Sequence, residues 1–420
     1  MTSKQRDDAL AISDEWRGVL SLPELIETRL QRASVLGDAI DIVAIGKASR
    51  AMTSACCEIL GDQMHRALLV VDEADGFAPP RSEVVVGEHP LPGEGSVRAG
   101  ERLLAFLAEP TDATCTLFLV SGGASSLCAR PQPPVDTDDL HEIFNAALES
   151  GIDITTLNRL RAATSSIAGG AVLRHVRTVR SIALIMVDNV VSGAPWVASA
   201  LTYDYESNEG EVSALLGQID RLGTSLALRV VESSVARRQS MRRPVTTVHE
   251  NFVVAQPSML LDTAAHCAAQ RGYRVVRMGS DLHGDVHDVI DDLSQLLSHE
   301  LLMPGPLCVL GVGEVTVQVR GSGSGGRCQE FAWAMAEVLA GFERPGVFVA
   351  RASDGRDFLP GVAGAWIDAS TTRKAQELGI NWSDVSLRND TFTGLSALDQ
   401  LLSGTSTGWN LCDLYITLFE

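Results

Sequence analysis

The chain has 420 residues, of which 45% are hydrophobic and 21% are charged, values that fit a globular protein with two domains. Its 34 basic and 53 acidic residues give a formal net charge of −19, which disfavours nucleic acid and anionic membranes as partners. The N-terminus is polar and no apolar run approaches membrane-spanning length, so we expect a soluble, cytoplasmic protein. The eight cysteines include no CxxC pair, so we expect reduced thiols and no zinc site.

Short apolar runs alternate with amphipathic stretches in the first half of the chain. The runs that predict strands are 40–46, 67–72, 83–87, 115–121 and 181–188. Helices are predicted over 47–60 and 96–108, where apolar residues recur at helical spacing. Strands this apolar, separated by helices, predict a doubly wound, Rossmann-like parallel sheet covered on both faces. We assign this N-terminal domain to residues 1–245.

A polar stretch rich in Ser, Arg and Glu, from 204 to 248, separates the two halves. The second α/β domain, residues 246–420, is expected to contain a mixed sheet. Its predicted strands are 252–255, 273–279, 346–353 and 414–419, with a hairpin or paired strands over 307–321 and a helix over 258–270. We expect the active site to lie in the cleft between the two domains.

The first candidate motif, IGKAS at 45–49, places Lys47 between a strand and a helix. Open parallel sheets bind ligands at the carboxyl ends of their strands, where helix N-termini attract anions. A lysine at this position suits phosphate. The motif is short, and a surface lysine at a helix start explains it equally well.

The second motif, VSGGASSL at 120–127, opens a buried strand into Gly122 and Gly123, followed by Ser125. Glycine turns with following hydroxyl groups can cradle phosphate through backbone amides. The motif lacks the GK[ST] ending of a Walker loop. A tight strand–helix turn would explain the glycines without explaining the hydroxyl cluster.

The third motif lies within 320–334, where Gly325 and Gly326 lead into Arg327 at a predicted helix start. An arginine held there could bind phosphate or carboxylate through paired N–H donors, or stabilise a transferring phosphoryl group. The alternative is a flexible glycine linker, which the buried character of the flanking segments disfavours.

The fourth motif, within 352–365, puts Asp354 just after a strand. A carboxylate there could bind Mg²⁺ or accept a hydroxyl proton, although Asp-Gly is also a common turn. The histidines of DLHGDVHD (281–288) are interpreted as a solvated helix start, not a metal site. His89 is left open between a functional residue and a turn.

Taken in order, these segments resemble the glycerate 2-kinase family, whose C-terminal domain is named after its MOFRL motif. The resemblance rests on GKAS, GEHPLPGEGS, VSGGASSL, TLNRLRAATSSIAGG, GEVTV, GSGGRCQE, SDGRDF with GVAGA, LRNDTF and STGWNLCDL, which span almost the whole chain. It implies phosphorylation of the 2-hydroxyl of D-glycerate by ATP with a divalent metal, Mg²⁺. It also implies two domains that close over the site by a hinge motion.

The resemblance carries over roles residue by residue. It implies that Lys47, Arg327 and Asp354 are the active-site residues, with Asp354 also the metal ligand. The residues that it or the motifs above assign to nucleotide binding are Gly122, Gly123, Ser125, Asn189, Glu314, Gly325, Gly326, Asn389 and Asp390.

Several positions depart from the family pattern. Ala124 replaces the third glycine of its turn, and Ala168 replaces a lysine before the paired glycines. Asn189 stands where an aspartate is usual, Cys328 replaces an asparagine, and Trp409 interrupts the closing motif. Loss of a cation and a carboxylate near phosphate should alter anion or metal binding, since charge-assisted hydrogen bonds contribute about 1.5–3 kcal/mol each.

The sequence thus favours an ATP-dependent kinase of a small hydroxy acid, most simply D-glycerate, with a different hydroxylated acceptor as the alternative. A catalytically silent nucleotide- or metabolite-binding homologue is a second hypothesis, motivated by Ala168 and Asn189. A nicotinamide-dependent reductase is a third, and the absence of a dinucleotide fingerprint argues against it. We expect no nucleic acid or membrane partner, and a homodimer is compatible with the sequence.

Overall fold

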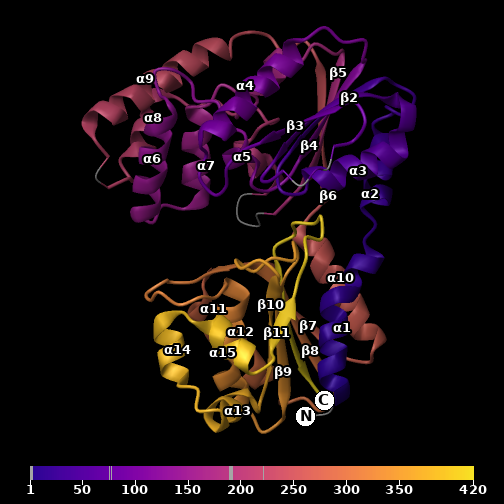
Figure 1. Cartoon of the computed structure of the whole chain (residues 1–420), viewed down its shortest axis with the longest axis vertical. Helices are drawn as coiled ribbons and strands as arrows, with labels where there is room; N and C mark the ends of the chain where they lie inside the picture. Colours follow the sequence, from indigo (N-terminus) through magenta and orange to yellow (C-terminus); the bar gives the residue numbers. More distant parts are fainter. Residues whose placement is uncertain (1–2, 75, 77, 189–192, 221) are drawn as a thin grey trace. The chain divides into compact units, whose positions relative to one another are not determined.

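The computed structural model describes the chain except residues 1–2, 75, 77, 189–192 and 221. It divides into two compact units, each with its own sheet (Figure 1). The N-terminal unit is Leu22–Ala255, and the C-terminal unit is Met1–Ser21 with Gln256–Glu420. The division falls ten residues after the boundary expected from sequence, and the first 21 residues belong to the second unit.

The N-terminal unit contains a six-stranded sheet in the order β3-β2-β1-β4-β5-β6, with every neighbouring pair parallel. Its strands are β1 Ile40–Ile45, β2 Met64–Val71, β3 Ser82–Val86, β4 Cys115–Val120, β5 Arg180–Met186 and β6 Val248–Ala255. The doubly wound prediction is confirmed, and the order reverses between β1 and β4. The run 252–255, expected in the second domain, belongs to β6 because it pairs with β5.

Helices cover both faces of this sheet (Figure 1). The helical elements of the unit are α2 Leu22–Arg32, α3 Ser49–Leu60, η1 Gly61–Gln63, α4 Glu94–Ala108, α5 Ala124–Leu127, α6 Thr137–Glu149, α7 Ile154–Ala163, η2 Ala171–His175, η3 Ala194–Ser199, α8 Glu209–Leu216 and α9 Thr224–Ser240. The strands β1 and β4 are fully buried, as expected for a parallel sheet between helical layers. A second apolar core forms where α6, α7, α8 and α9 pack together.

The C-terminal unit contains a mixed six-stranded sheet in the order β11-β10-β9-β12-β8-β7. Its strands are β7 Arg274–Asp285, β8 Leu307–Thr316, β9 Gly346–Ala352, β10 Val362–Asp368, β11 Leu401–Ser403 and β12 Asp413–Phe419. β7 and β8 are parallel, and β12 runs antiparallel to both β8 and β9. The hairpin expected over 307–321 is wrong: β8 is one strand, since it is paired on both sides within the sheet.

Helices of the C-terminal unit also lie on both sides of its sheet (Figure 1). They are α1 Ser3–Val19, α10 Pro257–Gln270, α11 Val286–Glu300, α12 Arg327–Ala340, α13 Thr371–Glu377, α14 Trp382–Arg388 and α15 Thr391–Ala397. α1 and α10 pack together on one face, with α11 and α12 on the other. Trp409, a departure from the family pattern, packs edge-on against Trp16 of α1, with ring centroids 5.9 Å apart.

α11 begins directly after β7, where Asp285 caps it by accepting from the amide of His287 at 2.9 Å. The helix start expected over 281–288 is therefore right only at its end, because 281–285 belongs to β7, which pairs with β8. None of the helices in the described part of the chain is long and apolar enough to cross a membrane.

Candidate active site

Lys47 is the second residue after β1, at the place where the strand order reverses. Its amide donates to the carbonyl of Gly122, beyond the end of β4, at 2.9 Å. The next amide, of Ala48, donates to the hydroxyl of Ser121 at 3.0 Å. The two motifs that the sequence singled out in the first half therefore form one structure. Doubly wound sheets bind ligands at such a reversal point.

The glycine turn after β4 packs against the side chains of Lys47 and His89. Gly123 has φ of +80°, and a Cβ built on it would lie 3.4 Å from Cγ of Lys47 and 3.2 Å from Cδ2 of His89. Burial, followed by the charges of Lys47 and Arg161, lowers the pKa of His89 to about 4. The imidazole is therefore neutral at pH 7, able to donate from one nitrogen and accept at the other.

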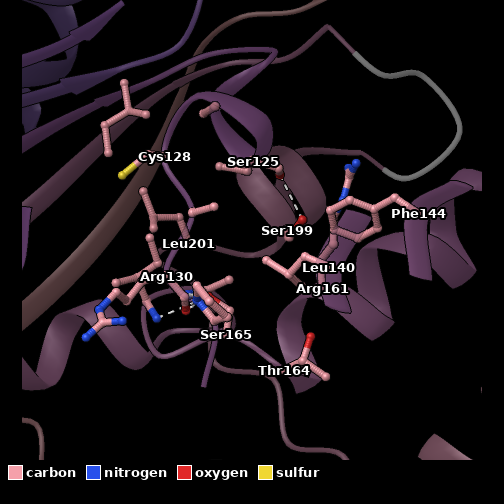
Figure 2. A pocket seen from close by; sticks show the side chains of 17 residues that line it. Ser125, Cys128, Arg130, Leu140, Phe144, Arg161, Thr164, Ser165, Ser199 and Leu201 are labelled. Carbon is pink, nitrogen blue, oxygen red and sulfur yellow. Dashed lines mark hydrogen bonds between the residues drawn. The ribbon is translucent and has the colours of Figure 1, made fainter. Parts of the chain in front are cut away.

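Ser125 lines a hollow beside this turn (Figure 2). Its hydroxyl lies 2.8 Å from that of Ser199, which donates to the side-chain oxygen of Asn158 at 3.0 Å. Ala168 lines the same hollow. Asn189, predicted to bind nucleotide, lies outside the described residues.

In the C-terminal unit, Arg327 is the first residue of α12, and its side chain pairs with two carboxylates. Its guanidinium donates to both oxygens of Asp413, at 2.5 and 3.0 Å, and forms an ion pair with Glu314 at 2.7 Å. Asp413 is 1% exposed, whereas the Arg327 side chain is 33% exposed. Burial alone would lower the pKa of Arg327, but Asp413 and Glu314 outweigh it and raise this pKa above its usual value.

The side chain of Asp357 caps the N-terminus of the same helix, α12. Its buried carboxylate accepts from the amides of Cys328 and Gln329 at 3.1 and 3.0 Å, and from the Gln329 side chain at 2.9 Å. Burial, followed by the charge of Asp413, raises the pKa of Asp357 to about 6. Cys328 is fully buried beneath this cap, so its substitution for asparagine changes the support of Arg327 rather than an exposed surface.

Asp354 lies two residues beyond the carboxyl end of β9. One of its carboxylate oxygens accepts from the amide of Arg356 at 2.9 Å, which fixes the loop locally. Gly355 has φ of +81°, and a Cβ there would come within 2.0 Å of the carbonyl of Thr405. Only glycine fits this position without displacing the neighbouring backbone.

Four charged residues lie at the edge of the mixed sheet that the carboxyl ends of β8 and β9 form: Glu314, Arg327, Asp354 and Asp413. Asp413 is opposite Gly313 of β8 and Ala352 of β9 in the strand register. One arginine against three carboxylates leaves this edge formally acidic, which suits a divalent cation better than a bare anion. Mg²⁺ is commonly held by one or two carboxylates together with substrate phosphates. The described residues contain no preformed cluster of three or more ligand side chains.

Asn389 and Asp390 hold the glycine-rich loop before α12. The Asn389 side chain accepts from the amides of Arg320 and Gly321 at 2.7 and 3.2 Å. Asp390 accepts from the amide of Ser324 at 3.1 Å. These two residues thus shape the loop through its backbone.

Gly325 and Gly326 occupy the last turn of that loop, where there is no room for side chains. A Cβ on Gly325 would lie 2.3 Å from the hydroxyl of Thr391, and one on Gly326 would lie 2.3 Å from the carboxylate of Asp357. The glycines therefore permit close packing around the start of α12.

Comparison with known proteins bears on both units. Residues 19–231 match the family described as a domain of unknown function, DUF4147, and residues 307–413 match the MOFRL family. The first match alone covers just over half of the chain. The chain belongs to the glycerate 2-kinase family. The resemblance inferred from the ordered motifs is thereby confirmed.

Individual members of the glycerate 2-kinase family match along nearly their whole length. The D-glycerate 2-kinase of Thermotoga maritima is 26% identical over 402 residues, covering 91% of each chain. A protein of Agrobacterium vitis, named provisionally as a hydroxypyruvate reductase, is 27% identical and is covered to 97%. The crystal structure of glycerate kinase from Thermotoga maritima covers 100% of both chains with a TM-score of 0.85 at 23% identity, which shows a shared fold.

Two residues that the structure places among the candidate groups had no role assigned from sequence: Arg161 and Asp357, which only tertiary contacts reveal. His89 was left open between a functional residue and a turn, and the structure places it beside the Gly123 turn. Asp413 stands in the closing motif of the glycerate 2-kinase family, which is its signal in the sequence.

Proposed function

We propose that this chain is an ATP-dependent kinase that phosphorylates a hydroxyl group of a small hydroxy acid, with D-glycerate as the reference acceptor. The observation that carries the proposal is the junction of Lys47 with the Gly122–Gly123 turn at the reversal point of the parallel sheet. This is the position at which such sheets bind nucleotides and other phosphates. The kinase names of family relatives support the same activity.

Lys47 would supply a mobile positive charge to the phosphates of ATP, and the backbone of the glycine turn would permit their close approach. In phosphoryl transfer the protein contributes mainly positioning and charge neutralisation. The acceptor oxygen forms a bond to the γ-phosphorus while the bond to the ADP oxygen breaks, and the hydroxyl proton passes to a base.

Asp354 is the proposed ligand of Mg²⁺ or the group that orients the attacking hydroxyl, with Glu314 as a second carboxylate. These two carboxylates would hold Mg²⁺, which when bound would supply neutralisation of the charge that develops on the phosphoryl group. Arg327, oriented by the Asp413 carboxylate, retains N–H donors beyond those it uses in the network. These groups suit a metal–phosphate complex better than a free anion.

We further propose that Lys47 and Asp354 both act in the phosphoryl-transfer step. A double-mutant cycle on kcat/KM tests this: Lys47→Met and Asp354→Asn should be strongly non-additive if they act in one transition state. Additive effects would contradict a role in the same step.

The activity itself is tested by ADP release with ATP and Mg²⁺ over a panel of hydroxy acids, with ³¹P NMR to identify the phosphorylated oxygen. We expect turnover with at least one acceptor and none without an acceptor. Binding of ATP with no turnover on any acceptor would instead favour the silent homologue. Oxidation of NADH with hydroxypyruvate would favour a reductase.

A further inference from the structure

The hollow beside Ser125 contains an arginine without an opposite charge. Arg161 of α7 lines it, and its Nε is buried with no hydrogen-bond partner. The guanidinium lies 4.5 Å from the ring centroid of Phe144, the contact seen in Figure 2. Among the described residues, no carboxylate forms an ion pair with it. Burial lowers the pKa of Arg161 to about 10, so the group stays cationic at pH 7.

A buried, unpaired guanidinium lowers the stability of a fold, since a buried charge needs a partner to offset desolvation. Such a group is retained most readily where an anionic ligand pairs with it. Arginine is also the side chain whose planar donors fit a carboxylate in a bidentate manner.

Much of the rest of the hollow is apolar, although Arg130, Thr164 and Ser165 also line it. Its cavity volume is about 30 Å³, and the space between its lining residues, open solvent included, is about 480 Å³. Its aliphatic and aromatic walls include Ile45, Leu140, Phe144, Ile167, Ala168 and Leu201, all nearly inaccessible to solvent. The hydroxyls of Ser125 and Ser199 add polar groups to those of Thr164 and Ser165. The second lining cation, Arg130, already forms an ion pair with Glu101 at 3.7 Å. Among the described residues, Arg161 is therefore the lining cation without a carboxylate partner, and a carboxylate on a hydrocarbon body matches both its charge and the apolar walls.

The wall that η3 contributes, which packs against α7, is held in a strained conformation. Ala198, Ser199 and Ala200 are consecutive non-glycine residues with φ between +52° and +60°. The carbonyls of Ser199 and Ala200 accept from the amides of Gly169 and Gly170 at 3.1 and 2.9 Å, which fixes the segment. Left-handed backbone at non-glycine residues is costly and is concentrated at ligand sites.

We propose that this hollow binds the acceptor: Arg161 pairs with its carboxylate, and Ala168 with its apolar neighbours contacts a hydrocarbon substituent. The inference rests on the proposed kinase function and refines its substrate class. The preferred acceptor is then a 2-hydroxy acid with an apolar side chain. The second hydroxyl of glycerate would lie against aliphatic groups, where an unpaired hydroxyl is unfavourable.

An acceptor series tests the apolar part of the site. ADP release is measured at saturating ATP for D-glycerate, D-2-hydroxybutyrate and D-2-hydroxyisocaproate. Each buried methylene group should raise kcat/KM about fourfold. Ala168→Lys, which fills the hollow with a charged chain, should reverse the order. A preference for D-glycerate that Ala168→Lys leaves unchanged would overturn the inference.

The role of Arg161 is tested by Arg161→Gln and Arg161→Lys, with exposed Arg159→Gln on the same helix as the matched control. The KM for the acceptor should rise about 10- to 100-fold in Arg161→Gln, while the KM for ATP stays within about twofold. Arg161→Lys should recover part of the loss. A rise in the KM for ATP instead would assign the guanidinium to the nucleotide and overturn the inference.

A binding measurement separates this inference from the kinase function. Isocaproate, which carries the carboxylate and side chain but no hydroxyl, is titrated by calorimetry without ATP. Wild type should bind it and Arg161→Gln should not. If no acceptor is phosphorylated but this pattern holds, the kinase proposal fails and the site stands. If acceptors are phosphorylated but isocaproate binds both proteins equally, or neither, the site fails.

The melting temperature distinguishes an arginine that binds a ligand from one that stabilises the fold. Arg161→Met should melt at or above the wild-type temperature, since it removes an unpartnered buried charge. A large fall in melting temperature would show that Arg161 stabilises the fold and would count against the site.

Discussion

Gly355 and Gly361 offer a matched pair of perturbations in one loop. Both have φ of +81°, so alanine at either position adopts the same unfavourable backbone conformation. A Cβ on Gly361 meets nothing within 4 Å, whereas one on Gly355 would lie 2.0 Å from the Thr405 carbonyl and 3.2 Å from Cγ2 of Thr407. The comparison therefore separates steric overlap from backbone strain.

The left-handed conformation should cost either alanine variant about 1–2 kcal/mol. Overpacking adds about 1–3 kcal/mol to Gly355→Ala alone. The melting temperature of a unit of this size changes by about 2–4 °C per kcal/mol. We therefore expect Gly355→Ala to melt about 2–12 °C below Gly361→Ala. Because the overlap moves the loop that carries Asp354, its kcat should also fall at least about tenfold.

Urea unfolding followed by tryptophan fluorescence measures the effect, since five of the six tryptophans lie in the C-terminal unit. Circular dichroism at the same urea concentrations reports both units together. Equal stabilities for the two alanine variants would refute the steric argument. A destabilised Gly355→Ala enzyme with wild-type kcat would refute the link between this loop and catalysis.

Three further substitutions probe the charged groups. Asp413→Asn removes one partner of a buried ion pair and should lower the free energy of unfolding of the C-terminal unit by about 2–4 kcal/mol. Adding Arg327→Met should restore part of this stability. Urea unfolding measures the single and the double variant. Burial raises the pKa of Glu330 from 4.5 to about 7, so its contribution to stability is greatest in acid and falls as the pH rises to 7. From pH 5 to pH 8, the stability of Glu330→Gln relative to wild type should therefore improve by about 1–2 kcal/mol after solvent screening, and an unchanged difference would contradict this. Lys47→Met should lower kcat/KM for ATP by about 100-fold without changing the melting temperature, whereas exposed Lys4→Met should change neither.

The sequence predicted the parallel sheet of the N-terminal unit because its central strands are buried on both faces and are therefore continuously apolar. β1 and β4 illustrate this, since every residue in both is buried. The edge strand β6 was misassigned because partial exposure weakens its pattern and because its residues pair with β5 residues at least 68 positions earlier, as Val248 does with Arg180. Pairing over such a distance is set by tertiary structure.

The candidate site was predictable where backbone and chemistry coincide in sequence. Lys47 and the Gly122–Gly123 turn each stand at a strand end, so the sheet order brings them together. Arg161 had no such signal, because it lies within a helix. Its interest comes from the lack of a carboxylate partner among the described residues, which only the structure reveals. The role of Asp357 was equally hidden, since it caps a helix that begins 30 residues earlier in the chain.

The central position of β12, between β9 and β8, affects how the protein can fold during synthesis. Helix α1 leaves the ribosome first, yet it packs against β9 and β12, which are made near the end of translation. Its buried residues Ile12 and Trp16 must wait for those strands, while the N-terminal unit has every segment of its sheet available once residue 255 has emerged. Nascent chains arrested after residue 400 should accordingly hold a protease-resistant N-terminal unit with an unprotected first helix.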